Sequence, residues 1–233
     1  MTRCRHTIAL ALVVVAFVVG CSGGDHDDDG HGPTQSVHTQ RDALAAAVRV
    51  EALGCSASGA AGAGSFIARE RVITVAHVVA GSTSVEVVLA DGRRVAAKVT
   101  GIDRAADLAI LDVEEPTAPL ATGRMPRRAT GEFVVYREGE AVALPFRVLR
   151  YGDIQVPGYA DDGPAHRHGY ELQAEVAEGD SGSVLVADGV ATALMFARSA
   201  DNRERAWAVD ISEAAPLLAA DNDEAVDTGA CWP

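Results

Sequence analysis

The residues best suited to carry out chemistry lie at 179–182, where the sequence is Gly-Asp-Ser-Gly. A serine between two glycines on a tight turn can present its hydroxyl and leave backbone N–H groups free beside it. An acyl-transfer nucleophile needs both features, because its attack creates an oxyanion that the N–H groups must stabilise. These residue types also form ordinary turns, so Ser181 needs partners elsewhere in the chain.

Two such partners precede Ser181. His77 follows a β-branched apolar run at 72–76, and Asp107 comes directly before an apolar segment at 108–111. A general base must reach the nucleophile with one ring nitrogen and hold a carboxylate with the other. Taken singly, a buried histidine, a turn aspartate and a hairpin serine would be ordinary. The order His77, Asp107, Ser181 in one chain favours a catalytic triad.

These three segments resemble those of the trypsin-like (chymotrypsin-fold) serine proteases. The segment Gly-Ser-Phe-Ile-Ala at 64–68 is similar to the HtrA-type bacterial branch. A further likeness is to the periplasmic acid-resistance serine proteases of mycobacteria, which carry a cysteine before that segment and a closing Thr-Gly-Ala-Cys. Cys55 and residues 228–231 match both features, and the resemblance runs over about 48–231.

The resemblance implies an all-β, chymotrypsin-like double β-barrel with a short C-terminal helix and with the active site between the barrels. It also implies that the N–H groups of Gly179 and Ser181 form the oxyanion hole, and that no cofactor or metal is needed. Ser183 and Val184 depart from the family's Gly and Pro. In digestive proteases the equivalent of Asp180 pairs with a newly released N-terminal amine; no such start precedes this domain, so the partner of Asp180 stays open.

The resemblance also places a candidate substrate pocket. Glu175, six residues before the nucleophile, would lie at the base of the primary pocket and favour Arg or Lys in the substrate. Because strand residues alternate, a shift of one position would turn Glu175 to solvent. Met195, Phe196 and Ala197 are expected to form the strand beside the bound peptide, which favours an apolar preference. Both preferences stay open.

Away from the motifs the sequence predicts many short strands. Asp-Gly pairs at 91–92 and 188–189 predict hairpins. Short strands at such spacing suit a sandwich or a barrel, and the motifs select the double barrel. The first barrel is expected at about 48–114, the second at about 130–210, and a closing helix at 211–220.

The N-terminus predicts export. Two arginines precede an apolar run at 8–19, which is too short to span a bilayer comfortably. Residues 1–20 are therefore expected to be a lipoprotein signal peptide, because Val-Val-Gly-Cys at 18–21 resembles a bacterial lipoprotein processing box. The alternatives are an ordinary secretory signal or an uncleaved anchor. We expect a lipid on Cys21 to anchor the exported protein to the bacterial cell envelope, on its periplasmic or outer face.

The remaining cysteines predict a disulfide. Of the four cysteines, Cys4 leaves with the signal peptide and Cys21 takes the lipid. Cys55 and Cys231 are then a pair in an exported domain, which is the setting where disulfides form. Neither cysteine has the spacing of a zinc site.

Composition limits what the rest can do. Residues 21–41 are expected to be a flexible acidic tether, so that 42–233 form the protease domain. Aspartates and histidines at 25–31 include metal-ligand types, but such a tract usually stays solvated, and no metal is expected. A formal net charge of −13 argues against nucleic acid. Protein or peptide substrates are the expected partners, and nothing indicates the oligomeric state.

The sequence thus predicts a membrane-anchored, exported serine endopeptidase that cleaves envelope or misfolded proteins through a His-Asp-Ser triad. One alternative is a catalytically weak or inactive protease-fold lipoprotein that binds a protein partner. Only the departure at Ser183 supports this alternative. Another is an exported esterase with the same triad. Esterases more often carry Gly-x-Ser-x-Gly on an α/β sheet, and the β-rich pattern disfavours that class.

Overall fold

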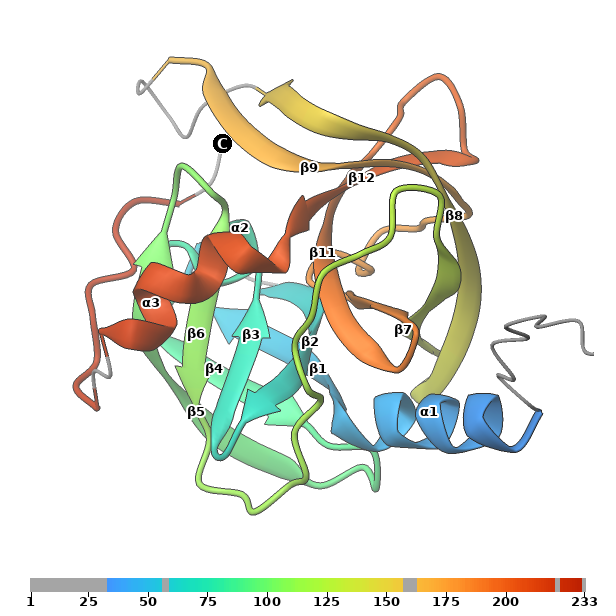
Figure 1. Ribbon diagram of the computed structural model, residues 1–233. Coiled ribbons are helices and arrows are strands. Elements are labelled where there is room, and N and C mark those ends of the chain that lie inside the picture. The colour runs from blue at the N-terminus through green and yellow to red at the C-terminus, as the bar shows by residue number, and fades with distance from the viewer. Residues whose placement is uncertain (1–32, 56–58, 157–162, 221–222, 232–233) are drawn as a thin grey trace, which may run out of the picture. The chain divides into compact units, whose positions relative to one another are not determined.

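Strand-forming sequence closes into two barrels in the part of the chain that the structure describes. This computed structural model describes residues 33–55, 59–156, 163–220 and 223–231. In Figure 1 the strands of the first barrel run from blue to green, and those of the second from olive to orange-red. The all-β, chymotrypsin-like double barrel expected from the sequence is confirmed.

The first barrel has six strands in the spatial order β1-β2-β3-β6-β5-β4. Its strands are β1 (Ala47–Leu53), β2 (Ala60–Ala68), β3 (Arg71–Thr74), β4 (Ser84–Val88), β5 (Arg94–Asp103) and β6 (Leu108–Asp112). Alternation sets the inner face: Val85 and Val87 are buried while Glu86 between them is exposed. The Asp-Gly pair at 91–92 joins β4 to β5 as a hairpin, as expected.

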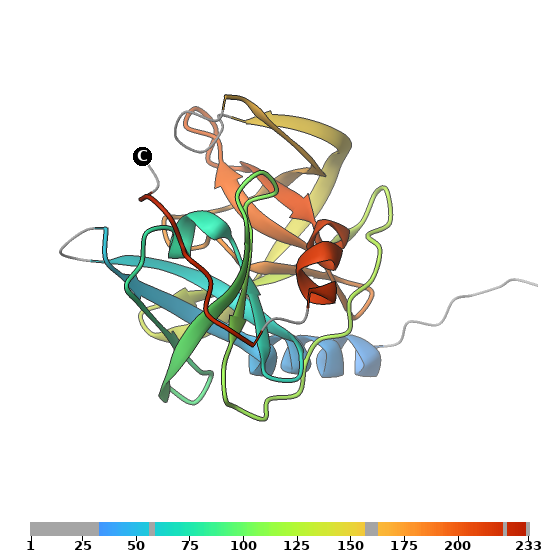
Figure 2. The same cartoon turned by 90° about the vertical axis from the view of Figure 1, so that its left-hand side faces the viewer.

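The second barrel is also closed and six-stranded, in the order β10-β11-β12-β9-β8-β7. Its strands are β7 (Thr130–Arg137), β8 (Glu140–Val156), β9 (Ala165–Ala174), β10 (Val184–Ala187), β11 (Val190–Arg198) and β12 (Arg205–Asp210). β8 and β9 are much longer than the sequence suggested, and they form the long hairpin at the top of Figure 2. Their outer ends, residues 150–156 and 165–169, mix charged, polar, aromatic and apolar residues with glycine, so hydropathy alone does not reveal them.

Helices complete the domain. A short α2 (Ala76–Val79) carries His77, and the chain after β12 forms a 3₁₀ turn, η1 (Ile211–Ala214), followed by α3 (Ala215–Ala219). This is the expected closing helix. Among the helices of the described residues, none combines the length and apolarity needed to cross a membrane.

The N-terminal side differs from expectation. α1 (Pro33–Ala46) occupies the last part of the segment assigned to the flexible tether at 21–41. Pro33 suits the first helical position. Ala43 and Ala46 are buried, and Gln40 Nε2 lies 2.9 Å from both carboxylate oxygens of Glu132 on β7. The segment becomes helical because the barrel supplies contacts that a polar sequence does not reveal.

The C-terminal segment is fastened to the first barrel. Cys55 and Cys231 form a disulfide, with Cα atoms 5.5 Å apart and a sequence separation of 176 residues. Thr228 O accepts the Gly81 N–H at 3.2 Å, and Thr228 Oγ1 donates to Ser82 O at 3.0 Å. The tail is thereby held beside the C-terminal end of α2.

Candidate active site

The turn that carries Ser181 lies between β9 and β10 and is pressed against the first barrel. Ala63 N donates to Ser181 O at 2.7 Å, and Gly182 N donates to Met195 O at 2.8 Å. Gly182 has φ +90°, and a Cβ there would lie 2.0 Å from Ala63 O. Only glycine fits this position, so the sequence Gly-Asp-Ser-Gly has a steric reason for its last residue.

The backbone of the same turn offers two N–H groups. Asp180 N donates to Ala177 O, and Ser183 N donates to Asp180 O. By contrast, no acceptor within the described part of the chain takes the N–H of Gly179 or of Ser181. The two groups proposed from the resemblance are thus available to bind an oxyanion.

His77 and Asp107 come from neighbouring elements of the first barrel. His77 Nδ1 lies 2.9 Å from Asp107 Oδ2, and the backbone N–H of His77 donates to Asp107 Oδ1, also at 2.9 Å. Asp107 is buried and has φ +60°, a sparsely populated conformation for a non-glycine residue. Asp103 steadies the preceding turn, because its Oδ1 accepts the Ala106 N–H at 2.9 Å.

A cleft of about 440 Å³ brings the predicted residues together. Its walls include His77 and Val78 from α2 and Gly179 and Ser181 from the nucleophile turn. They also include the predicted substrate strand, Met195, Phe196 and Ala197. The cleft is therefore lined by His77, which pairs with Asp107, and by Ser181, beside two N–H groups that have no acceptor among the described residues. These are the groups that acyl transfer requires.

Of the two orientations that the sequence left open for Glu175, the structure has the one that turns it away from the cleft. Its side chain is exposed, and it is not among the residues that line the cleft, whereas Val176, Ala177 and Glu178 are. The cause is the alternation that left the question open: Ala174 and Val176 are buried on either side of it. The cleft wall at this point combines the apolar Val176 and Ala177 with Glu178.

Two contacts of arginines with buried carboxylates were not predicted. Arg137 on β7 pairs with Asp180, which is fully buried; this supplies the partner that the sequence left open. Arg167 on β9 donates from Nη1 to Asp107 Oδ2 at 3.3 Å. Nothing in the local sequence marks either arginine, since their partners lie 43 and 60 residues away.

Ser183 departs from the family pattern, and it is buried with its Oγ lacking a hydrogen-bond partner among the described residues. Its backbone is well placed, because Ser183 O accepts the Met195 N–H at 2.9 Å. The hydroxyl is therefore a cost to stability rather than an obstacle in the cleft.

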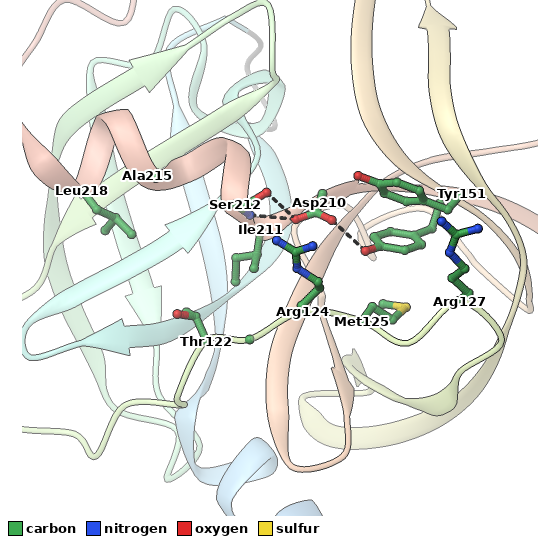
Figure 3. Close-up of a pocket in the computed structure, with 12 residues that line it drawn as sticks. Thr122, Arg124, Met125, Arg127, Tyr151, Asp210, Ile211, Ser212, Ala215 and Leu218 are labelled. Atoms are coloured by element: carbon green, nitrogen blue, oxygen red, sulfur yellow. Dashed lines mark hydrogen bonds between the residues drawn. The ribbon is translucent and has the colours of Figure 1, made fainter.

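A second hollow of about 470 Å³ lies away from these residues, between the inter-barrel connection, the β8–β9 hairpin and η1 (Figure 3). Tyr170 Oη donates to Asp210 Oδ2 at 2.7 Å, and Asp210 Oδ1 accepts the N–H of Ser212 at 2.9 Å. Burial, and then the hydrogen bond to Asp210, raise the pKa of Tyr170. The contacts secure η1 against β9.

The predicted lipid site at Cys21 and the aspartate- and histidine-rich tract at 25–31, where no metal was expected, lie outside the described residues. In the residues that are described, no group of three or more His, Cys, Asp or Glu side chains is placed to hold a metal ion.

Known proteins are similar to this chain in sequence. The model of the trypsin-like peptidase domain matches residues 62–194. The serine protease Rv3671c of Mycobacterium tuberculosis is 34% identical over 177 residues, which are 73% of this chain and 44% of that protein. The chain thus spans less than half the length of the curated relatives it matches.

Solved structures are similar as well. The crystal structure of the active form of the Rv3671c protease from M. tuberculosis superposes with a TM-score of 0.76 at 30% identity, over 87% of this chain and 92% of that one. The HtrA-type protease AlgW, solved with a tripeptide, gives a TM-score of 0.68 at 18% identity, over 79% of this chain and 62% of that one. At that identity the second likeness concerns the fold alone.

Proposed function

Because this chain belongs to the trypsin-like peptidase family, we propose that it is an exported serine endopeptidase, anchored to the cell envelope, that cleaves envelope or misfolded proteins. One observation carries the proposal: His77 and Ser181 line one cleft, and Asp107 is buried behind the histidine at hydrogen-bond distance. Nucleophile, base and orienting acid are the parts that peptide hydrolysis needs.

The hydrogen bond to Asp107 sets the roles on His77. A carboxylate only accepts, so the His77 nitrogen facing it, Nδ1, carries the ring proton and Nε2 keeps its lone pair. Nε2 takes the proton of Ser181 as the hydroxyl oxygen attacks the peptide carbonyl. The imidazolium then gives that proton to the leaving amine, and water repeats the sequence on the acyl-enzyme. Asp107 stabilises the imidazolium throughout.

The oxyanion is received by the N–H groups of Gly179 and Ser181. Support comes from their lack of internal acceptors in the described residues. Loss of one such donor typically lowers the rate about 10²–10³-fold. The chemistry uses this chain's own side chains and backbone.

The cleft wall supports an apolar preference for the substrate. Val176, Met195 and Phe196 line it, and Glu175 is turned to solvent. Peptides with Leu at the cleaved position should therefore be hydrolysed faster than matched peptides with Arg, and Glu175→Gln should leave that ratio unchanged.

Anchoring is proposed through a lipid on Cys21. In cells, the full chain should partition into detergent, and Cys21→Ser should release it to the aqueous phase. Mass spectrometry of the mature N-terminus shows directly whether Cys21 carries a lipid. An unlipidated N-terminus would contradict the proposed anchor.

Labelling with a fluorophosphonate tests the enzyme assignment. The reagent phosphonylates a serine only when a base and an oxyanion hole activate it. We expect an adduct on Ser181 by peptide mapping, and none in Ser181→Ala or His77→Ala. A folded wild-type protein that takes no label would instead favour the protease-fold binding protein.

A further inference from the structure

Arg167 on β9 contacts both the Asp107 side of the proposed active site and Phe196 in the wall of the cleft. Its Nη1 donates to Asp107 Oδ2 at 3.3 Å, and its Nε donates to Ala105 O at 3.0 Å. Its guanidinium carbon lies 4.6 Å from the ring centroid of Phe196, within cation–π range. One side chain therefore contacts the carboxylate, the turn that presents it, and the wall of the cleft.

The burial of this cation calls for an explanation. Arg167 is 3% exposed, and its Nη2 is buried without a hydrogen-bond partner among the described residues. Burial lowers the pKa of Arg167, although Asp107 and Asp103 act in the opposite direction. An apolar side chain of the same volume would often stabilise such a position better than a buried ion pair. Stability alone is thus a poor reason for an arginine here.

We propose that Arg167 is a positioning residue of the catalytic machinery, which holds the Asp107 carboxylate against His77 and places a fixed positive charge beside that pair. The inference rests on the proposed function, because it assigns a role within that triad. Phe196, stacked on the same guanidinium, ties this arrangement to the cleft wall.

The geometry around Asp107 explains the positioning role. Its oxygens accept from the His77 backbone N–H, His77 Nδ1 and Arg167 Nη1. His77 and Arg167 share the same oxygen, Oδ2. Without the arginine, Oδ2 loses a charged donor, and the φ +60° conformation of Asp107 is left with fewer restraints.

The fixed charge has its own consequence. A cation beside the pair repels any further positive charge that develops there. Removing the cation removes this repulsion. The acid limb of the pH–rate profile would then move to higher pH.

Other charged groups near the pair are unchanged by a substitution at Arg167. Asp103 lies at the end of β5, and Glu178 and Arg198 line the cleft. On β9 itself, His166 and His168 are exposed on the opposite side of the strand from the buried Arg167. A shift common to two neutral substitutions at Arg167 therefore reports on the arginine.

The test is the rate of fluorophosphonate labelling at Ser181 as a function of pH, on folded full-length protein. Arg167→Met removes charge and hydrogen bonds, Arg167→Gln keeps a donor without the charge, and Arg167→Lys keeps the charge. Tyr170→Phe is the matched control, because Tyr170 is equally buried on β9 and loses a hydrogen bond to a different carboxylate.

We expect the midpoint of the acid limb of the pH–rate profile to move to higher pH by about 1 unit in Arg167→Met and Arg167→Gln. In Arg167→Lys and Tyr170→Phe the midpoint should not change. The plateau rate should fall about tenfold in Arg167→Met, since Asp107 is less well held. If Arg167→Met does not fold, Arg167→Gln carries the same test of charge.

Two outcomes overturn the inference while leaving the enzyme assignment intact. In one, the wild-type protein is labelled at Ser181, but Arg167→Met and Arg167→Gln have the same acid-limb midpoint as wild type. In the other, Tyr170→Phe shifts the limb as far as they do, which would show a general effect of weakening β9. Absence of labelling in wild type would overturn both the proposed function and this inference.

Discussion

Arg137 forms a two-pronged ion pair with Asp180: Nη1 lies 2.5 Å from Oδ1, and Nη2 lies 2.7 Å from Oδ2. Asp180 is fully buried, and its Oδ2 also accepts the Ala177 N–H at 2.8 Å. The hydrogen bond to Asp180 raises the pKa of Arg137. The carboxylate beside Ser181 is thus paired by a side chain of β7, so the turn needs no chain terminus to hold it.

Arg137→Met should destabilise the protein and slow labelling of Ser181. The substitution leaves a buried carboxylate without its partner, a change that typically lowers the free energy of unfolding by several kcal/mol. Since Arg137 is 37% exposed, solvent offsets part of the loss, and we expect about 2 kcal/mol by urea unfolding.

An exposed pair provides the control for that experiment. Arg150 pairs with Glu171 at 3.2 Å with 62% of its side chain exposed. Arg150→Met should lower the free energy of unfolding by less than about 1 kcal/mol and leave labelling unchanged. Equal losses in the two variants would contradict a special role for the Arg137–Asp180 pair.

The sequence predicted the motif residues, such as His77, but not the arginines that pair with Asp180 and Asp107. Short motifs with strict steric or chemical demands marked His77, Asp107 and Ser181, and the same motifs selected a double barrel for the short strands. Arg137 and Arg167 act across the fold on partners far away in the chain. Such pairings follow from strand register, which no local pattern records.

Glu175 and α1 illustrate two further physical limits of the sequence. Along a strand, an error of one position reverses the face of a side chain, and Glu175 points to solvent beside a buried Val176. The segment expected to be a tether, 21–41, is too polar to fold alone. α1 forms where Ala43 and Ala46 are buried, a contact visible only in the folded domain.

Ser183→Ala should stabilise the protein. The Ser183 hydroxyl is buried without a hydrogen-bond partner among the described residues, and removing such a group recovers its desolvation penalty. We expect the free energy of unfolding to rise by about 1 kcal/mol in urea titrations.

Thr192 is the matched hydroxyl for this test. It is equally buried, but its Oγ1 donates to Leu185 O at 3.0 Å. Thr192→Val should therefore lower the free energy of unfolding by about 1 kcal/mol. A loss of stability in both variants would mean that the Ser183 hydroxyl does have a partner in solution.

The disulfide should contribute substantially to stability. Cys55 and Cys231 close a loop with a separation of 176 residues, for which the chain-entropy model gives about 5 kcal/mol. We expect Cys231→Ser to lower the free energy of unfolding by about 3–5 kcal/mol, with Cys55→Ser and the double variant equal to it. Unequal losses among the three would point to local strain or packing instead of loop closure.

Tyr136 should make stability depend on pH in the alkaline range. Its Oη donates to Ala47 O at 2.9 Å, and burial raises the pKa of Tyr136 from 10.0 to about 12. The folded protein therefore keeps the neutral phenol at a pH where the unfolded chain has lost the proton. This contribution is complete below about pH 10 and disappears as the pH rises through about 12.

Urea unfolding of wild type and Tyr136→Phe at about pH 8 and about pH 11 measures this effect. The variant should be less stable at the lower pH, and the gap should narrow at the higher pH because only wild type loses the phenol's contribution. Tyr151, with 49% of its surface exposed, supplies the control: the gap between wild type and Tyr151→Phe should stay constant. A Tyr136→Phe gap that is also constant would show that the phenol is not protected by burial.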